Sequence, residues 1–332
     1  MRFLLDDEQR AFTRSLDAML TAAGTAAATR AWGAGDHAPG RALWRRLADA
    51  GVFALAVPEE FEGVGPLPVE TAVALVEWGR HAVPGPVVET VAAAALLARL
   101  AEDGEREPAK RFLPSLASGT ASATLTLPAE LPGAGPLALD ADAADLILTV
   151  TDGELRLAPG HARVRTSLDA ARRLAAPLPG GELLAAGPAV TAAARHAARW
   201  AALATAAQSL GVGLALLDRT VAYVRRRTQF GAPIGSFQAV KHRLADVLIR
   251  LEFARPLVFG AATTMAPGDV AAAKVTAAEA AYGAARAALQ LHGAIGYTAE
   301  FDLSLWLTKA RALHGAWGDP GVWRGRALAT GE

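Results

Sequence analysis

Four long helical patterns fill the chain from about Val190 onward, and they constrain the fold more than any other feature of the sequence. These alanine-rich stretches carry apolar side chains at helical spacing over 190–227, 236–265, 268–293 and 302–313. The segment Pro267-Gly268-Asp269 separates the second from the third, and we expect Asp269 to cap the third helix. Long helices joined by short breaks pack side by side, so the sequence predicts a C-terminal four-helix bundle.

The first 117 or so residues also have helical patterns, interrupted by proline and glycine. Asp6 and the acidic residues after it suit the start of a helix, where carboxylates accept free N–H groups. Further helices are predicted from about Pro68 to Trp78, from Val91 to Leu100 and around Arg111–Leu113. We therefore expect an N-terminal helical domain over residues 1–118.

Between about residues 119 and 187 the pattern changes from helix to strand. Predicted strands lie at Thr124–Leu127, Leu146–Val150 and Glu154–Leu157, with Val164–Thr166 and Leu183–Leu184 as further candidates. Asp152-Gly153 is a hairpin signal, because both residues tolerate positive φ. The predicted fold is mainly α with a small β-domain. It has a reduced β-domain over 119–188 and a helical bundle domain over 189–332.

The charge and residue composition exclude several kinds of site. Lys and Arg total 33, as do Asp and Glu, so the formal net charge is zero, which argues against a nucleic-acid surface or a polybasic membrane anchor. Cysteine is absent, which excludes disulfides and thiolate chemistry, and the seven histidines are too widely spaced to predict a metal site. No unbroken apolar run reaches the roughly 20 residues of a membrane span, and the N-terminus does not resemble a signal peptide. We expect a cytoplasmic protein.

Two segments of the C-terminal half carry residues suited to binding a nucleotide. Arg227 stands at a predicted helix end, and Phe230 follows it before a Gly-Pro turn. A guanidinium can bind a pyrophosphate with two hydrogen bonds, and an aromatic ring can stack on adenine. In the second segment, Gln290 and Gly293 can present amide and backbone groups to a phosphate or ribose. The alternative is that Arg227 pairs with a carboxylate and Phe230 lies in a core.

These segments resemble the acyl-CoA dehydrogenase family of flavoproteins. Residues 225–246 are similar to its pattern R-x-x-F-G-x-P-I followed by F-Q-x-x-x-x-x-L-A-D/E, and residues 290–300 to its Q-x-x-G-G-x-G-Y/F-x-x-E. The resemblance extends to 7–9, 50–65 and 111–119 in the N-terminal part. In the family the matching residues bind the ADP half of FAD between two subunits. The resemblance implies that role for five residues here: Arg227, Phe230, Gln290, Gly293 and Ala294.

The chain departs from the family at the catalytic base. The family removes the α-proton of an acyl-CoA with a glutamate, while hydride leaves the β-carbon for the flavin. Counting without gaps, its two known glutamate positions fall on Trp317 and Ala201, and neither can take a proton. A tryptophan would also fill the acyl pocket. Three other acids of this half are either displaced bases or solvated and ion-paired carboxylates: Glu252, Glu300 and Asp319.

The β-domain departs from the family as well, since 119–187 contain neither the G-S-D loop nor the W-I-T/S strand that contact the flavin ring. The chain therefore resembles the catalytically incomplete subunit of a two-component bacterial acyl-CoA dehydrogenase, such as those acting on steroid side chains or other lipids. That implies an α2β2 hetero-oligomer in which this chain completes the FAD site of a second acyl-CoA dehydrogenase-like subunit, with acyl-CoA as substrate. Two alternatives remain, namely a self-sufficient dehydrogenase with a displaced base, and a non-redox scaffold that has lost flavin.

Overall fold

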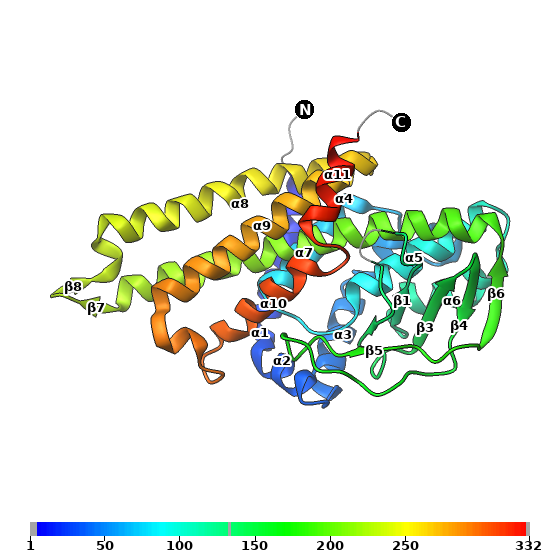
Figure 1. Cartoon of the computed structure of the whole chain (residues 1–332), viewed down its shortest axis with the longest axis horizontal. Helices are drawn as coiled ribbons and strands as arrows, with labels where there is room; N and C mark the ends of the chain where they lie inside the picture. Colours follow the sequence, from blue (N-terminus) through cyan, green and yellow to red (C-terminus); the bar gives the residue numbers. More distant parts are fainter. Residues whose placement is uncertain (1–4, 132–133, 330–332) are drawn as a thin grey trace.

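The computed structural model describes residues 5–131 and 134–329, and it is mainly helical with a small sheet region (Figure 1). Asp6 caps the first helix, because its side chain accepts a hydrogen bond from Gln9 N while the Gln9 side chain accepts one from Asp6 N. This confirms the predicted cap. The N-terminal elements are α1 (Asp7–Ala23), α2 (Thr25–Gly33), α3 (Ala38–Asp49), η1 (Phe53–Ala56), η2 (Glu59–Phe61), α4 (Pro68–Arg80), α5 (Val87–Glu102) and α6 (Glu107–Ala117).

The main sheet has four strands in the order β1-β3-β4-β6, with β1 parallel to β3 and the other pairs antiparallel. Asp152 and Gly153 have φ values of 53° and 73°, so the predicted hairpin turn is confirmed. The three main strands predicted from the sequence, at 124–127, 146–150 and 154–157, are also found. The strands are β1 (Ala123–Thr126), β2 (Ala138–Leu139), β3 (Leu146–Thr151), β4 (Glu154–Leu157), β5 (Leu174–Ala175) and β6 (Glu182–Ala186), and β2 pairs with β5.

One of the two further strand candidates is wrong. Leu183–Leu184 lies inside β6, but Val164–Thr166 forms no strand. Arg165 makes a single bridge to Leu174, whose strand is two residues long and already pairs with β2. Because β5 is only two residues long, the pairing along 164–166 stops at this single bridge.

The C-terminal half is the predicted bundle, in which α9 packs against α7, α8, α10 and α11. Its elements are α7 (Pro188–Arg226), β7 (Thr228–Gln229), β8 (Ala232–Pro233), η3 (Ile234–Ser236), α8 (Gln238–Thr264), α9 (Pro267–His292), η4 (Gly293–Tyr297), α10 (Leu303–Gly315) and α11 (Pro320–Leu328). The expected Asp269 cap is wrong, because Ala266 is the N-cap and Pro267 takes the first helical position. Asp269 lies in the first turn, where its carboxylate accepts a hydrogen bond from Thr264 Oγ1 at 2.7 Å.

Helix α7 is the centre of the fold. Of the helices described, α7 is long and apolar enough to cross a membrane, but its apolar window is entirely buried, as expected for a core helix. It meets α4 backbone to backbone, since a Cβ on Gly211 would lie 1.9 Å from Val76 O and one on Gly79 would lie 2.1 Å from Gln208 O. One hydrophobic cluster runs through all three segments of the chain. The division at 118 and 188 stays a prediction.

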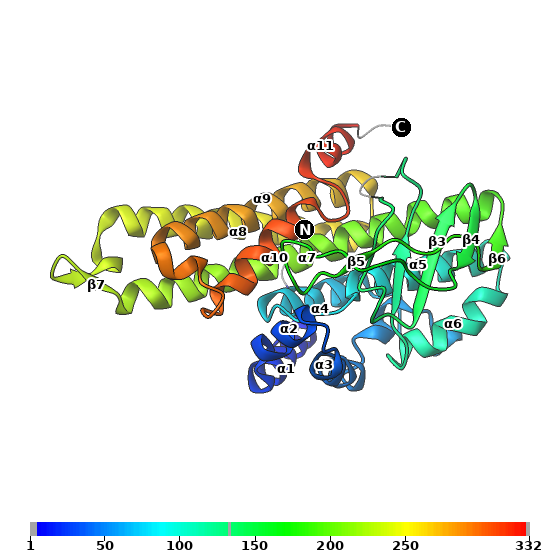
Figure 2. The same ribbon diagram turned by 60° about the horizontal axis from the view of Figure 1, so that its bottom comes forward.

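The two ends of the molecule differ in character. The main sheet lies beside α5 and the N-terminal end of α7 (Figure 2). The β7–β8 hairpin projects from the opposite end, where α7 and α8 meet (Figure 1). The predicted nucleotide residues of this hairpin therefore lie at the opposite end of the molecule from the sheet.

Candidate functional site

The first predicted nucleotide segment forms the exposed β7–β8 hairpin. Arg227 follows the last turn of α7, and its backbone N donates to Tyr223 O at 2.9 Å. Phe230 lies at the turn with a left-handed φ of 54°, and 94% of its side chain is exposed. Among the residues described, Arg227 has no carboxylate oxygen within 4.0 Å. The structure thus shows neither the ion pair nor the core burial of the alternative interpretation.

The second segment lies at the C-terminal end of α9. Gln290, Gly293 and Ala294 are all exposed, and Gly293 has a φ of 65° that favours glycine. The ends of α7 and α9 are held together, because the Tyr223 ring stacks on His292 with centroids 4.1 Å apart. The fold therefore brings both segments to one end of the bundle (Figure 1).

We call Arg227, Phe230, Gln290, Gly293 and Ala294 the nucleotide end. These residues fit the ADP half of FAD, since they combine a cation that has no ion pair within the described residues with an exposed aromatic ring.

Helix α8 lies along the edge of the bundle (Figure 1) and carries an exposed apolar stripe. Its side chains are Ile249, Phe253 and Leu257, which are 53%, 69% and 41% exposed. Their i, i+4, i+8 spacing puts these three on one face of the helix. A contiguous exposed stripe of this kind is typical of a protein–protein interface.

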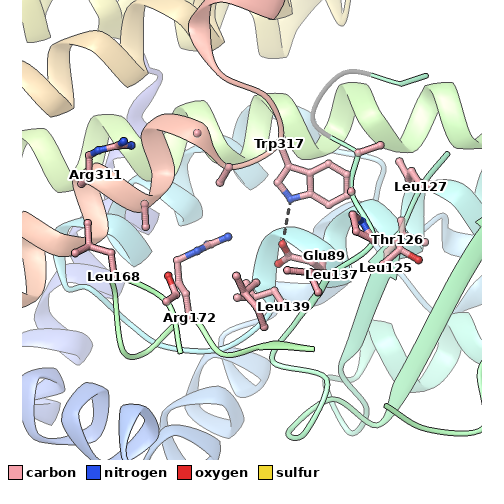
Figure 3. Close-up of a pocket in the computed structure, with 18 residues that line it drawn as sticks. Glu89, Leu125, Thr126, Leu127, Leu137, Leu139, Leu168, Arg172, Arg311 and Trp317 are labelled. Atoms are coloured by element: carbon pink, nitrogen blue, oxygen red, sulfur yellow. Dashed lines mark hydrogen bonds between the residues drawn. The ribbon is translucent and has the colours of Figure 1, made fainter. Parts of the chain in front are cut away.

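The predicted base position lies in a cavity of about 470 Å³ between β1, α5 and the end of α10 (Figure 3). Trp317 occupies that position with a left-handed φ of 52° and is 9% exposed. Its indole Nε1 donates a hydrogen bond to Glu89 Oε1 at 3.0 Å. The position thus holds a hydrogen-bonded ring rather than a free carboxylate.

Sequence reasoning missed Glu89, which lies in the first turn of α5 and is 3% exposed. Burial raises the pKa of its carboxyl group, because the charged form loses its water, while nearby Arg172 partly opposes the shift. Its second oxygen, Oε2, has no hydrogen-bond partner among the described residues. The signal was available, since Glu89 is the one charged residue in the apolar run from Val87 to Leu97.

The acids considered from the sequence lie elsewhere. Asp319 is the N-cap of α11 and accepts hydrogen bonds from Gly321 N at 2.7 Å and Val322 N at 3.3 Å. Glu252 pairs with Arg255 at 2.9 Å, and Glu300 is exposed. None of the three acids lines the cavity, and Ala201 is fully buried in α7.

Two family models match most of the chain. The acyl-CoA dehydrogenase N-terminal domain matches residues 6–120, and the acyl-CoA dehydrogenase C-terminal domain matches residues 191–326. The chain belongs to the acyl-CoA dehydrogenase family. This confirms the resemblance and the fold class expected from the sequence, and FAD is the cofactor of this family.

Relatives and solved structures agree with this membership. The chain is 36% identical over 308 residues to acyl-CoA dehydrogenase IpdE2 of Mycobacterium tuberculosis, covering 91% of each. It is 33% identical over 305 residues to FadE34 of the same organism, covering 87% of this chain and 42% of FadE34. Two solved structures are each 25% identical to it. They are the Tcur3481-Tcur3483 steroid ACAD G363A variant (TM-score 0.82, 97% of each chain) and the ChsE4-ChsE5 complex from Mycobacterium tuberculosis (TM-score 0.80, 100% of each chain).

Proposed function

We propose that this chain is the catalytically incomplete subunit of a hetero-oligomeric, FAD-dependent acyl-CoA dehydrogenase. The observation that supports the proposal most is the hydrogen bond from Trp317 to Glu89, at the position where the resemblance puts the family's base. The residues of the nucleotide end, in contrast, are all exposed. Such a chain has a surface for a cofactor, while the one carboxyl group in the cavity, that of Glu89, accepts a hydrogen bond from Trp317 and has a pKa raised by burial, which makes it a poor base.

The nucleotide end then completes the FAD site of the partner. Arg227 binds the pyrophosphate, the Phe230 ring stacks on adenine, and Gln290 with the backbone at Gly293 and Ala294 contacts phosphate or ribose. When bound, FAD supplies the hydride acceptor for the α,β-dehydrogenation of an acyl-CoA. The catalytic glutamate comes from the partner.

The apolar stripe of α8 supports an assembly, because its three side chains would be removed from water by a second subunit. The ChsE4-ChsE5 complex and the Tcur3481-Tcur3483 steroid enzyme, to which the chain is similar, pair two differently named chains. On that basis we propose an α2β2 enzyme of the cytoplasm with a second acyl-CoA dehydrogenase-like subunit. Its substrate class is the acyl-CoA of a steroid side chain or another lipid.

Co-expression with the partner tests the shared site through the FAD content per chain. We expect the chain alone to be colourless and inactive, and the complex to be yellow. Arg227→Gln and Phe230→Ala should each lower the FAD content without changing the mass of the complex. Arg225→Gln, on an exposed arginine two residues away, is the control and should leave FAD unchanged. A yellow, active homotetramer of this chain would refute the proposal, as would full FAD content in both variants.

A non-redox scaffold is the second candidate function. The hydrogen bond between Trp317 and Glu89 supports it as much as it supports the first. The two functions differ in the flavin spectrum of the complex. If the partner alone binds as much flavin as the complex of the two chains, the scaffold function holds. The self-sufficient dehydrogenase loses its main support, because Asp319 caps α11 and lies outside the cavity.

A further inference from the structure

The cavity beside Trp317 has a lining that the shared FAD site does not use. Leucines form much of its wall, including Leu125, Leu127, Leu137, Leu139 and Leu168. Arg172 and Arg311 also line it, and Figure 3 shows the Arg172 guanidinium directed toward Glu89 and Trp317. Its volume of about 470 Å³ suits a small molecule. A wall that combines apolar side chains with convergent polar groups is typical of a ligand site.

The positive charge of Arg172 is left without an ion pair in the described part of the chain, although acids lie on neighbouring segments. Lys309 forms an ion pair with Asp169, with Nζ and Oδ2 2.8 Å apart and both side chains buried. Arg173 forms an ion pair with Asp142 at 2.7 Å. Arg172 faces the cavity instead. A guanidinium in a partly apolar cavity favours an anion, above all a carboxylate that can accept two of its hydrogen bonds.

Glu89 supplies a second polar group at the same place. Its Oε1 accepts from Trp317, while Oε2 is buried and has no hydrogen-bond partner among the described residues. Burial raises the pKa of this carboxyl group, so the neutral form is favoured and carries a proton to donate. A buried polar atom without a partner is costly, and a ligand oxygen that accepts this proton removes the cost.

We propose that this cavity binds a small apolar carboxylate, whose anionic group lies at Arg172 and accepts a hydrogen bond from Glu89. The leucine wall holds the apolar body of the ligand, and Arg311 lies at the same wall as a second cation. The ligand is a free acid rather than the CoA thioester of the same acid, because forming the thioester removes the carboxylate that Arg172 binds. The site is built from this chain's own residues and does not depend on the shared FAD site.

Calorimetric titration of the full chain, alone and in its complex, tests the proposal with two matched probes. Cyclohexanepropionate has an apolar ring and a carboxylate, and cyclohexanepropanol keeps the ring and chain without the charge. We expect the acid to bind at least about tenfold more tightly than the alcohol, because charge-assisted hydrogen bonds are the stronger kind. Equal binding of the two probes, or no binding of the acid, would overturn the proposal.

Variants locate the binding within the cavity. Arg172→Gln should reduce the affinity for the acid to that of the alcohol, and Arg172→Lys should retain most of it. Arg163→Gln, on an exposed arginine of the same segment that does not line the cavity, is the control. Glu89→Gln should keep the affinity, because the amide still donates, whereas Glu89→Met should lower it. Acid binding unchanged by Arg172→Gln, or tighter binding of cyclohexanepropionyl-CoA than of the acid, would refute the assignment.

Discussion

The hydrogen bond between Trp317 and Glu89 can be measured with a double-mutant cycle, because each side chain can be replaced by an apolar one of similar shape. Trp317→Phe removes the indole N–H, and Glu89→Met removes the carboxyl group. The cycle compares the effect of the first substitution on the free energy of unfolding in the presence and absence of the second.

The structure sets the size of the effect. Donor and acceptor are 3.0 Å apart, and Trp317 and Glu89 are 9% and 3% exposed. In the wild-type chain, Trp317→Phe leaves a buried carboxyl oxygen unpaired at about 1–3 kcal/mol, in addition to about 1–2 kcal/mol of lost packing. In the Glu89→Met chain the oxygen is gone and only the packing loss remains. We therefore expect a coupling of about 1–3 kcal/mol.

Urea unfolding of the four full-length chains, followed by far-ultraviolet circular dichroism, provides the free energies. A second cycle with Trp200→Phe is the control, because Trp200 Nε1 bonds His196 rather than Glu89. That cycle should be additive within about 0.5 kcal/mol. If the Trp317 cycle is equally additive, the hydrogen bond does not hold the ring, and the interpretation of the closed base position is wrong.

Three further predictions concern other parts of the chain. Burial raises the pKa of Glu77 from 4.5 to about 7, so its folded form holds the proton more tightly. Its stabilising contribution is present below pH 4.5 and lost as the pH rises through 7, so the free energy of unfolding should fall by up to about 3 kcal/mol over this range. Glu77→Gln should make the free energy of unfolding less dependent on pH, as measured by chemical unfolding at a series of pH values. Phe253→Ala should weaken assembly with the partner by about 2 kcal/mol, or about 30-fold, in analytical ultracentrifugation, while Leu183→Ala on β6 should not. Lys309→Met should cost about 3–5 kcal/mol in chemical unfolding by leaving Asp169 buried and unpaired, and the added Asp169→Asn should recover part of it.

Features that depend on neighbouring residues in the sequence were predictable. The helices of the bundle were found within a few residues of their bounds, because proline and glycine mark their breaks and their apolar spacing is local. The cap of α9 was misplaced by three residues, since Pro267 can open a helix without losing a hydrogen bond. The strand at 164–166 failed for another reason. Strand pairing needs a partner strand of sufficient length, and neither sequence nor spacing shows that β5 is only two residues long.

The same distinction applies to the candidate site. Arg227 and Phe230 lie on one short hairpin, so the sequence pattern alone placed them together. Glu89 and Trp317 are 228 positions apart, and no spacing rule connects them. A lone acid in an apolar helical run was the available signal, because such a residue must find a partner or hold its proton. The sequence predicted a tryptophan at the base position, but it did not show that Glu89 contacts this tryptophan.

The two aromatic residues with a left-handed φ in the described part of the chain lie in different surroundings. Trp317 is held within the chain, by Glu89 at its indole and by Trp323 Nε1, which donates to Trp317 O at 2.7 Å. Phe230 and Gly231, with φ values of 54° and 78°, form the two-residue turn of the β7–β8 hairpin, which requires this backbone conformation. The Phe230 ring, however, is 94% exposed, and its aromatic neighbour Phe237 lies 6.4 Å away.

The Trp317 ring is therefore held by contacts within the chain, whereas the Phe230 ring is exposed and can contact another molecule. Substitutions at the nucleotide end should change FAD content only when the partner is present. Substitutions at Glu89 or Arg172 should change stability and carboxylate binding in the isolated chain as well. If instead Phe230→Ala destabilises the isolated chain as much as Trp317→Phe does, Phe230 has a structural role within the chain and the division between the two ends fails.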